Sequence, residues 1–235
     1  MGFIGTAAVR YYQDQGYAVT GCDVIEDGKV IDYYKVERIN PQYHKVFKEV
    51  SPHICLNASG ASSVPFSFHD PMIDFDLNVI NVIKMLEAAR IESPETSFIN
   101  ISSAAVYGTP SKLPVSEGFE IAAISPYGWH KHQSELLCSE YANIHDLKTC
   151  SMRVFSAYGP GLKKQLFWDL FQKTRAGKTI ELLGTGDESR DYIFVKDLVR
   201  ASEIIAQKSK LKGEVINIAT GIETTIREAA QTFIE

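Results

Sequence analysis

The residues that decide the fold of this chain are NISSAAVYG at 100–108 and, after a proline-containing loop, SPYGWHK at 125–131. The first segment predicts the end of an apolar strand that finishes in serine hydroxyls. In the second, Pro126 suits the first turn of a helix, so Tyr127 and Lys131 fall four residues apart on one helical face. The lysine ammonium can then approach the phenol. Its charge would help to lower the phenol pKa from about 10, as a base acting near neutral pH requires.

A Tyr-x-x-x-Lys pair alone also occurs on solvated helices, and the serine-rich strand end before it favours a catalytic site. Working outward, apolar runs and turn residues alternate in a way that predicts strands separated by helices. Such alternation implies parallel pairing through right-handed crossovers, hence an α/β fold with a doubly wound parallel sheet of the Rossmann type. We expect strands at 17–22, 33–36, 54–56, 98–101, 149–155 and 214–218, and helices at 8–16, 43–50, 70–90, 127–141, 166–171 and from 225 onward.

A turn-rich segment at 156–161 predicts the exit from the sheet to a smaller region. We expect residues 1–158 to form a nucleotide-binding domain to which 190–205 return. Residues 159–189 and 206–235 are expected to form a partial substrate-binding region.

A glycine-containing segment at the start of the chain leads directly into a helical pattern. Glycines there would let a phosphate approach a helix N-terminus, where unpaired N–H groups favour negative charge. Asp23 lies 18 positions after Gly5 (23 minus 5), at the end of the next strand, where a ribose diol is usually held. The first strand and first glycine of the full fingerprint are absent, so an ordinary glycine-rich helix start and a solvated aspartate remain alternatives.

Composition excludes several classes of protein. The 235 residues are 45% apolar, enough for a sizeable core, and the net charge of -5 argues against a nucleic-acid surface. Four cysteines lie far apart without a Cys-x-x-Cys pair, so no metal site or disulfide framework is indicated. No apolar run approaches the roughly 20 residues of a membrane span. We expect a cytoplasmic protein without a membrane partner.

Three segments together resemble the extended short-chain dehydrogenase/reductase family, in its NAD-dependent sugar-nucleotide epimerase/dehydratase branch, which includes UDP-glucose 4-epimerases. They are SSAAVYG at 102–108, PYGWHK at 126–131 and GTGDESRDYIFVKD at 184–197. The resemblance covers nearly the whole chain. It implies a Rossmann fold, NAD as the cofactor, a nucleotide sugar as the substrate, and a homodimer as a possible assembly.

The resemblance also implies roles for particular residues. Ser103 would hydrogen-bond the sugar, Tyr127 would be the base and acid, and Lys131 would bind the nicotinamide ribose and lower the Tyr127 pKa. Arg190 would hold the substrate diphosphate, and Ser156 stands where an asparagine commonly reaches the substrate. The remaining cofactor contacts would be Gly2, Phe3, Ile4 and Gly5 at the pyrophosphate, Asp23 at the adenosine ribose, and Ala58 and Asn78 near the nicotinamide.

Three hypotheses follow. The leading one is an epimerase that works through a transient keto-sugar, and the alternatives are a net reductase and a non-catalytic nucleotide-binding protein of the same fold. Ala104 and Ala105 stand where dehydratases of the branch carry Asp-Glu, which argues against dehydration. Asn57 and Ser156 depart from the family pattern, and the second departure leaves the substrate class open. Because the chain begins inside the phosphate loop and stops within a helical pattern, we expect it to lack the first strand and part of the C-terminal region.

Overall fold

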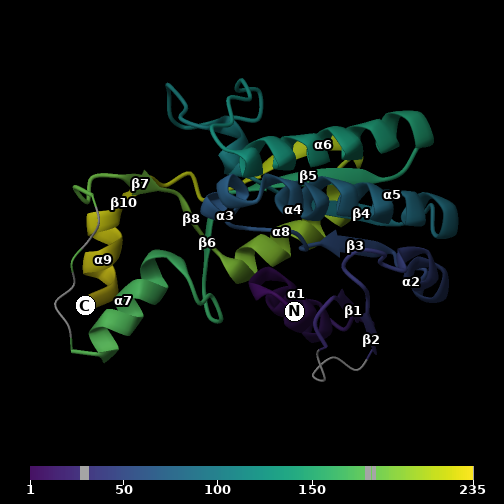
Figure 1. Ribbon diagram of the computed structural model, residues 1–235, viewed down its shortest axis with the longest axis horizontal. Helices are drawn as coiled ribbons and strands as arrows, with labels where there is room; N and C mark the ends of the chain where they lie inside the picture. The colour runs from purple at the N-terminus through teal and green to yellow at the C-terminus, as the bar shows by residue number, and fades with distance from the viewer. Residues whose placement is uncertain (27–31, 178–180, 182–183, 235) are drawn as a thin grey trace.

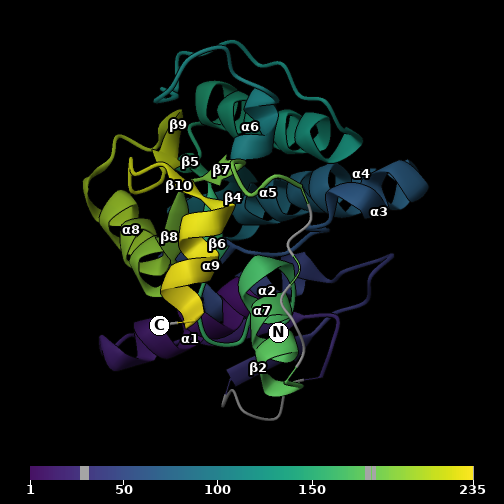
Figure 2. The same cartoon turned by 90° about the vertical axis from the view of Figure 1, so that its left-hand side faces the viewer.

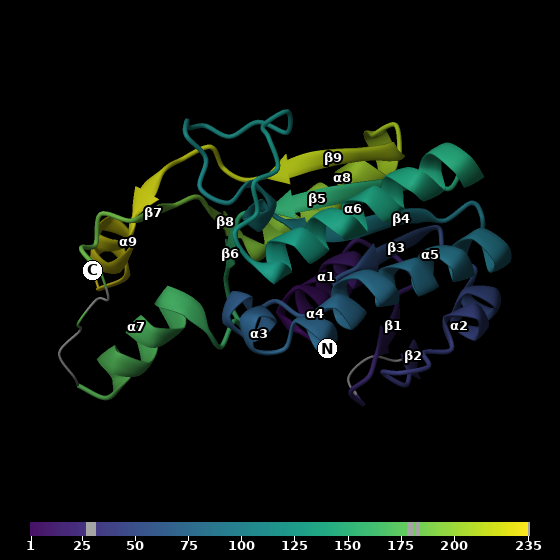
Figure 3. The ribbon, with the colours of Figure 1, turned by 45° about the horizontal axis from the view of Figure 1, so that its top comes forward.

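A parallel four-stranded sheet forms the centre of the structure, a computed structural model that describes residues 1–26, 32–177, 181 and 184–234 (Figure 1). Its strands follow the order β3-β4-β5-β9, and every pair is parallel (Figure 3). Almost every residue of β4 and β5 is buried, as expected of central strands covered on both faces. The strands are β3 (Ile54–Asn57), β4 (Ser97–Ser103), β5 (Thr149–Val154) and β9 (Lys212–Ile218).

A second parallel pair, β1 (Thr20–Asp23) with β2 (Asp32–Lys35), lies on the β3 side of this sheet (Figure 3). Within the described ranges, no backbone pairing joins β1 to β3. The predicted α/β class with a parallel central sheet is confirmed, and the strands lie within a few residues of their expected positions.

Helices cover both faces of the four-stranded sheet, and β4 shows why. Successive side chains of a strand point to opposite faces, so Ile99 packs in one core with residues of α1 and α8, while Phe98 packs in another with α2, α5 and α6. The helices are α1 (Phe3–Asp14), α2 (Tyr43–Val50), α5 (Asn81–Glu92), α6 (Pro126–His145) and α8 (Val195–Lys208).

The helix expected at 70–90 is present but interrupted. Asp70 caps its start by accepting a hydrogen bond from the Ile73 amide at 3.0 Å. A π-helical turn, η1 (Asp76–Ile80), then separates α4 (Pro71–Phe75) from α5. Such turns often occur at functional sites, and this one carries Asn78. A short helix that the sequence analysis did not predict, α3 (Val64–His69), precedes it and is capped by the Ser63 hydroxyl.

A smaller region lies beyond the carboxyl end of the sheet (Figure 3), and its helices α7 and α9 face the viewer in Figure 2. Helices α7 and α9 pack together there, and the ring of Phe167 contacts those of Tyr158, Tyr192 and Phe233. Strand β6 pairs with β8, and β7 pairs with β10. The elements are β6 (Ser156–Tyr158), α7 (Gln165–Arg175), β7 (Ser189–Arg190), β8 (Tyr192–Phe194), β10 (Thr224–Thr225) and α9 (Ile226–Ile234).

One expected boundary is corrected by β9. Residues 206–235 were assigned to the substrate-binding region, but β9 pairs with β5 in the central sheet, and α8 continues to Lys208. The reason is that the edge of β5 opposite β4 offers backbone N–H and C=O groups with which β9 can pair. The chain therefore returns to the central sheet before it enters the smaller region again. The rest of the division into two regions stays a prediction. Among the described residues, no helix is long and apolar enough to cross a membrane.

Candidate active site

The site is built where β4 ends. Ser103 is followed by a 3-10 turn, η2 (Ala104–Tyr107), and its hydroxyl accepts a hydrogen bond from the Ala105 amide at 3.2 Å. The first turn of α6 packs directly on η2, because a Cβ at Gly128 would stand only 2.6 Å from the Ala105 carbonyl oxygen. Only glycine permits that approach. The contact brings Tyr127 beside Ser103.

The start of α6 agrees with the sequence prediction. Ser125 caps the helix by accepting a hydrogen bond from the Gly128 amide at 3.1 Å, and Pro126 occupies the first turn. Tyr127 and Lys131 then lie on one helical face, with the ammonium 5.9 Å from the centroid of the phenol ring. Lys131 is buried and donates a hydrogen bond to the Ile101 carbonyl at 2.9 Å.

Burial and nearby charges shift the pKa values of both Tyr127 and Lys131. Burial raises the pKa of Tyr127, the nearby Ser103 hydroxyl lowers it, and the charge of Asp74 raises it further. Burial also lowers the pKa of Lys131 to about 8, against the opposing charges of Asp74 and Glu135. Desolvation is therefore the largest single influence on both pKa values.

The groups around Asn78 fit a bound dinucleotide. Both polar atoms of its side chain are buried and lack a hydrogen-bond partner within the described structure, which is costly unless a ligand supplies one. Gly60 lies against it, since a Cβ there would be 2.5 Å from the Asn78 oxygen. Ala58 follows β3 nearby in the chain and packs on the core.

The start of α1 fits a pyrophosphate. Gly2 is its N-cap residue and provides no side-chain cap, and the first turn carries no acidic residue. The first N–H groups of a helix have no partner within the helix, so those of Phe3, Ile4 and Gly5 suit an anion. Asp23 ends β1, where its carboxylate accepts hydrogen bonds from the two following amides, at 2.7 and 3.3 Å.

The structure does not bring every expected residue to the Tyr127 cluster. Arg190 is exposed on β7 in the smaller region, and its guanidinium donates to the Ser189 carbonyl at 2.7 Å. Ser156 begins β6 and lies opposite Tyr192 in the register. Their assignment to the substrate stays a prediction. Within the described ranges, no group of three or more His, Cys, Asp or Glu residues is arranged to hold a metal ion.

Sequence reasoning missed a buried charge network next to the site. Arg153 on β5 forms a bidentate ion pair with Glu135 on α6, at 2.9 and 2.7 Å, and Ser102 also donates to Glu135. Arg153 further donates to the Tyr107 hydroxyl at 2.9 Å. The signal was present in the sequence, because a charged residue inside the apolar run at 149–155 requires a buried partner.

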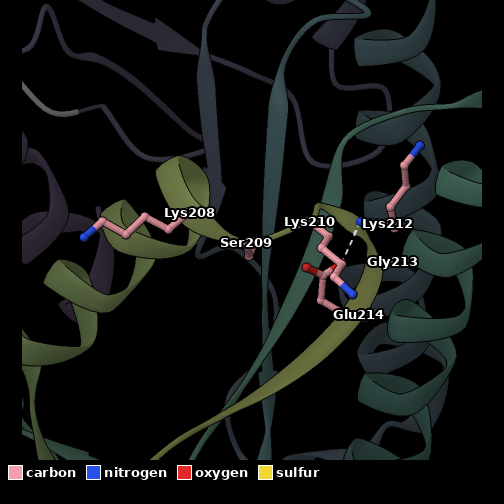
Figure 4. A pocket seen from close by; sticks show the side chains of 6 residues that line it. All are labelled: Lys208, Ser209, Lys210, Lys212, Gly213 and Glu214. Atoms are coloured by element: carbon pink, nitrogen blue, oxygen red, sulfur yellow. Dashed lines mark hydrogen bonds between the residues drawn. The ribbon is translucent and has the colours of Figure 1, made fainter.

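A surface hollow of about 560 Å³ lies elsewhere (Figure 4). Its position at the start of β9 is at the opposite end of the parallel sheet from Ser103, which ends β4. It therefore belongs to a different edge of the fold from the candidate site. It is lined by Lys208, Ser209, Lys210, Lys212, Gly213 and Glu214.

The fold and the cluster of Ser103, Tyr127 and Lys131 define an enzyme of the Rossmann class that uses a dinucleotide. The sequence profile of the NAD dependent epimerase/dehydratase family matches residues 1–219, and the chain belongs to this family. The predicted family is confirmed, and NAD is the cofactor that the family uses.

Individual relatives are similar to this chain over nearly its whole length. UDP-glucose 4-epimerase of Mycolicibacterium smegmatis is 28% identical over 242 residues, which cover 97% of this chain and 77% of the relative. The putative UDP-glucose 4-epimerase of Methanocaldococcus jannaschii is also 28% identical, with the same coverage. The crystal structure of UDP-glucose 4-epimerase with UDP-glucose from Thermotoga maritima is 26% identical, has a TM-score of 0.89, and matches 99% of this chain and 78% of that one.

Proposed function

We propose that this chain is a UDP-sugar 4-epimerase that inverts the sugar through a transient keto-sugar. The observation that carries the proposal is the Ser103, Tyr127 and Lys131 cluster at the end of β4, in a chain similar to UDP-glucose 4-epimerases over nearly all its length. Asn78, the start of α1 and Asp23 would hold NAD. Arg190 and Ser156 would contact the nucleotide sugar. The cytoplasmic location and the homodimer stay predictions.

Tyr127, Ser103 and Lys131 would each have a separate role in the reaction. Bound NAD supplies a hydride acceptor and, on the return, the hydride donor. Tyr127 takes the proton from the 4-hydroxyl and gives it back after the keto-sugar has turned over in the site. Ser103 hydrogen-bonds the same sugar oxygen. Lys131 adds positive charge beside the phenol, so that its ionised form is stabilised when the sugar is bound.

Incubation with UDP-glucose, UDP-N-acetylglucosamine and UDP-glucuronate, followed by proton NMR of the products, tests the proposal. We expect the 4-epimer of at least one sugar and no net change in NADH. A 4-keto-6-deoxy product would contradict the proposal, because the methyl groups of Ala104 and Ala105 cannot transfer the protons that dehydration needs. Stoichiometric consumption of NADH or NADPH would favour the reductase. The alternative of a non-catalytic nucleotide-binding protein would be favoured by tight NAD binding without turnover of any nucleotide sugar, GDP- and dTDP-sugars included.

Asp23 should make the protein prefer NAD to NADP. A carboxylate can accept hydrogen bonds from a ribose diol but repels a 2'-phosphate, and the sequence holds no Arg or Lys between Asp23 and Lys29. Asp23→Asn should weaken NAD binding by roughly tenfold, from the loss of about 1.5 kcal/mol, and should narrow the gap between the two cofactors. Calorimetric titration of both cofactors measures this. The matched control is Asp14→Asn at the exposed end of α1, and equal binding of both cofactors by the native chain would remove Asp23 from the ribose site.

A further inference from the structure

A short segment at 159–164, which we call the strap, joins β6 to α7 (Figure 3). It starts at Gly159, whose φ of +143° favours glycine. A Cβ there would stand 2.9 Å from a Val195 methyl carbon and 3.0 Å from the Phe194 ring. The strap therefore leaves β6 pressed against the start of α8.

The middle of the strap passes the start of α1. A Cβ at Gly161 would lie 4.0 Å from Cδ2 of the Phe3 ring, which is ordinary van der Waals contact. Phe3 is the first residue of α1, where the free N–H groups suit a pyrophosphate. The strap therefore borders the proposed cofactor site on its phosphate side.

The far end of the strap is hydrogen-bonded to the turn that follows β3. Nζ of Lys164 donates to the Ser62 carbonyl at 3.1 Å and to the Ser62 hydroxyl at 2.7 Å, across 102 positions of sequence. Hydrogen bonds from a charged donor are stronger than those between neutral groups. Gly60 of the same turn lies against Asn78. Lys164 thus holds the strap on the side of the proposed cofactor site where Asn78 lies.

The turn is itself anchored to the central sheet. The side-chain oxygen of Asn57 accepts hydrogen bonds from the Ser59 amide at 3.1 Å and from the Ser59 hydroxyl at 2.6 Å. Asn57 also donates to Asn100 on β4 at 3.0 Å, and both of these amide side chains are buried. The contact from Lys164 to Ser62 therefore ties the strap to a fixed part of the fold.

We propose that Lys164 retains the bound dinucleotide by holding the strap against Ser62, so that the cofactor leaves only when these hydrogen bonds open. The inference deepens the proposed function and rests on it for the position of the cofactor. Epimerisation needs such retention, because the hydride taken from the sugar must return from the same cofactor molecule before that molecule is released. Opening of a closed segment often limits the rate of release. The hydrogen bonds of Lys164 then set the rate at which NAD and NADH dissociate.

The rate of NADH release tests the proposal without a sugar substrate. The full chain is loaded with NADH, an excess of NAD is added, and the loss of bound-NADH fluorescence is followed by stopped flow. In Lys164→Met, which keeps most of the side chain but no donor, we expect release to be about tenfold faster, the size of one hydrogen bond to a charged group. The matched control is Lys163→Met, which removes the same charge from the neighbouring exposed residue. None of the residues that the structure describes forms a hydrogen bond or ion pair with Lys163, so release from this variant should match the native rate.

A double variant separates loss of this contact from a general loosening of the strap. Ser62→Ala removes the hydroxyl acceptor and leaves the carbonyl, so release should be roughly threefold faster than in the native chain. The same change made in Lys164→Met should add nothing, because the donor is already absent. Lys164 and Ser62 are both exposed, so these variants should fold as the native chain does, which circular dichroism checks.

Native release in Lys164→Met, or equal acceleration in Lys163→Met, would overturn the inference. A double variant whose acceleration is the product of the two single effects would also overturn it. If Lys164→Met releases NADH faster as expected but the native chain turns over no UDP-sugar, the proposed function alone is contradicted. A native chain that bound no NADH would overturn both.

Discussion

Replacing Tyr127 with phenylalanine should lower the epimerisation rate by about 10²–10⁴-fold, the range expected for loss of a general acid and base. The ring still fills its place on α6, so NAD and UDP-sugar affinities should change little. Because the deprotonated phenol is the active form and burial raises its pKa, the native rate should also increase with pH on the acid side. Steady-state rates, with dissociation constants measured separately, check these outcomes.

The matched control is Tyr141→Phe, which removes a phenol from the same helix. The Tyr141 hydroxyl donates to Glu87 of α5 at 3.1 Å, and Tyr141 lies 14 positions along α6 from Tyr127 (141 minus 127). The Tyr141→Phe substitution should therefore leave the epimerisation rate nearly unchanged. A Tyr127→Phe variant that retained the native rate would show that another group moves the proton.

Removal of Arg153 should give the largest loss of stability. Its side chain is 5% exposed and that of Glu135 is 3% exposed, so Arg153→Met leaves a buried carboxylate with only the Ser102 hydroxyl and the His132 ring, whose Nδ1 is 3.3 Å away. Breaking a buried pair in this way costs about 3–5 kcal/mol, against a total stability of about 5–15 kcal/mol for a typical domain. Urea unfolding followed by circular dichroism measures the change.

Two further variants separate the charge from the packing. The double variant Glu135→Leu with Arg153→Met should recover most of the loss, because no unpaired charge remains. Lys148→Ala breaks an exposed pair with Glu95 just before β5 and should cost less than about 1 kcal/mol. An Arg153→Met chain as stable as the Lys148→Ala chain would show that the buried pair contributes little.

The Arg153→Met variant also bears on the candidate site, because the Arg153–Glu135 network contacts both the end of β4 and helix α6. Ser102, which donates to Glu135, directly precedes Ser103, and Glu135 lies one helical turn after Lys131. The ion pair joins β5 to α6, and the hydrogen bond from Ser102 to the same carboxylate joins the end of β4 to α6. Loss of it should loosen the alignment of Ser103 with Tyr127 even where the chain still folds.

The sequence by itself determined most of the elements and the candidate cluster of Ser103, Tyr127 and Lys131. The alternation of strands and helices is a local pattern, and so are Pro126 and the four-residue spacing of Tyr127 and Lys131. These features depend on neighbours within one or two turns of the chain. For that reason the parallel sheet, the start of α6 and the placing of Tyr127 beside the end of β4 could be predicted.

Tertiary structure alone decided which distant residues meet and how deeply they are buried. Asp74 and His130 are 56 positions apart, and Glu135 and Arg153 are 18 apart on different elements, so no local pattern pairs them. The position of β9 in the central sheet was also decided by tertiary structure, because β9 pairs with the edge of β5, a strand more than 50 residues earlier in the chain. Burial also raises the pKa of Tyr127, an effect no local pattern shows, because desolvation is set by everything packed around a group and not by its neighbours in sequence.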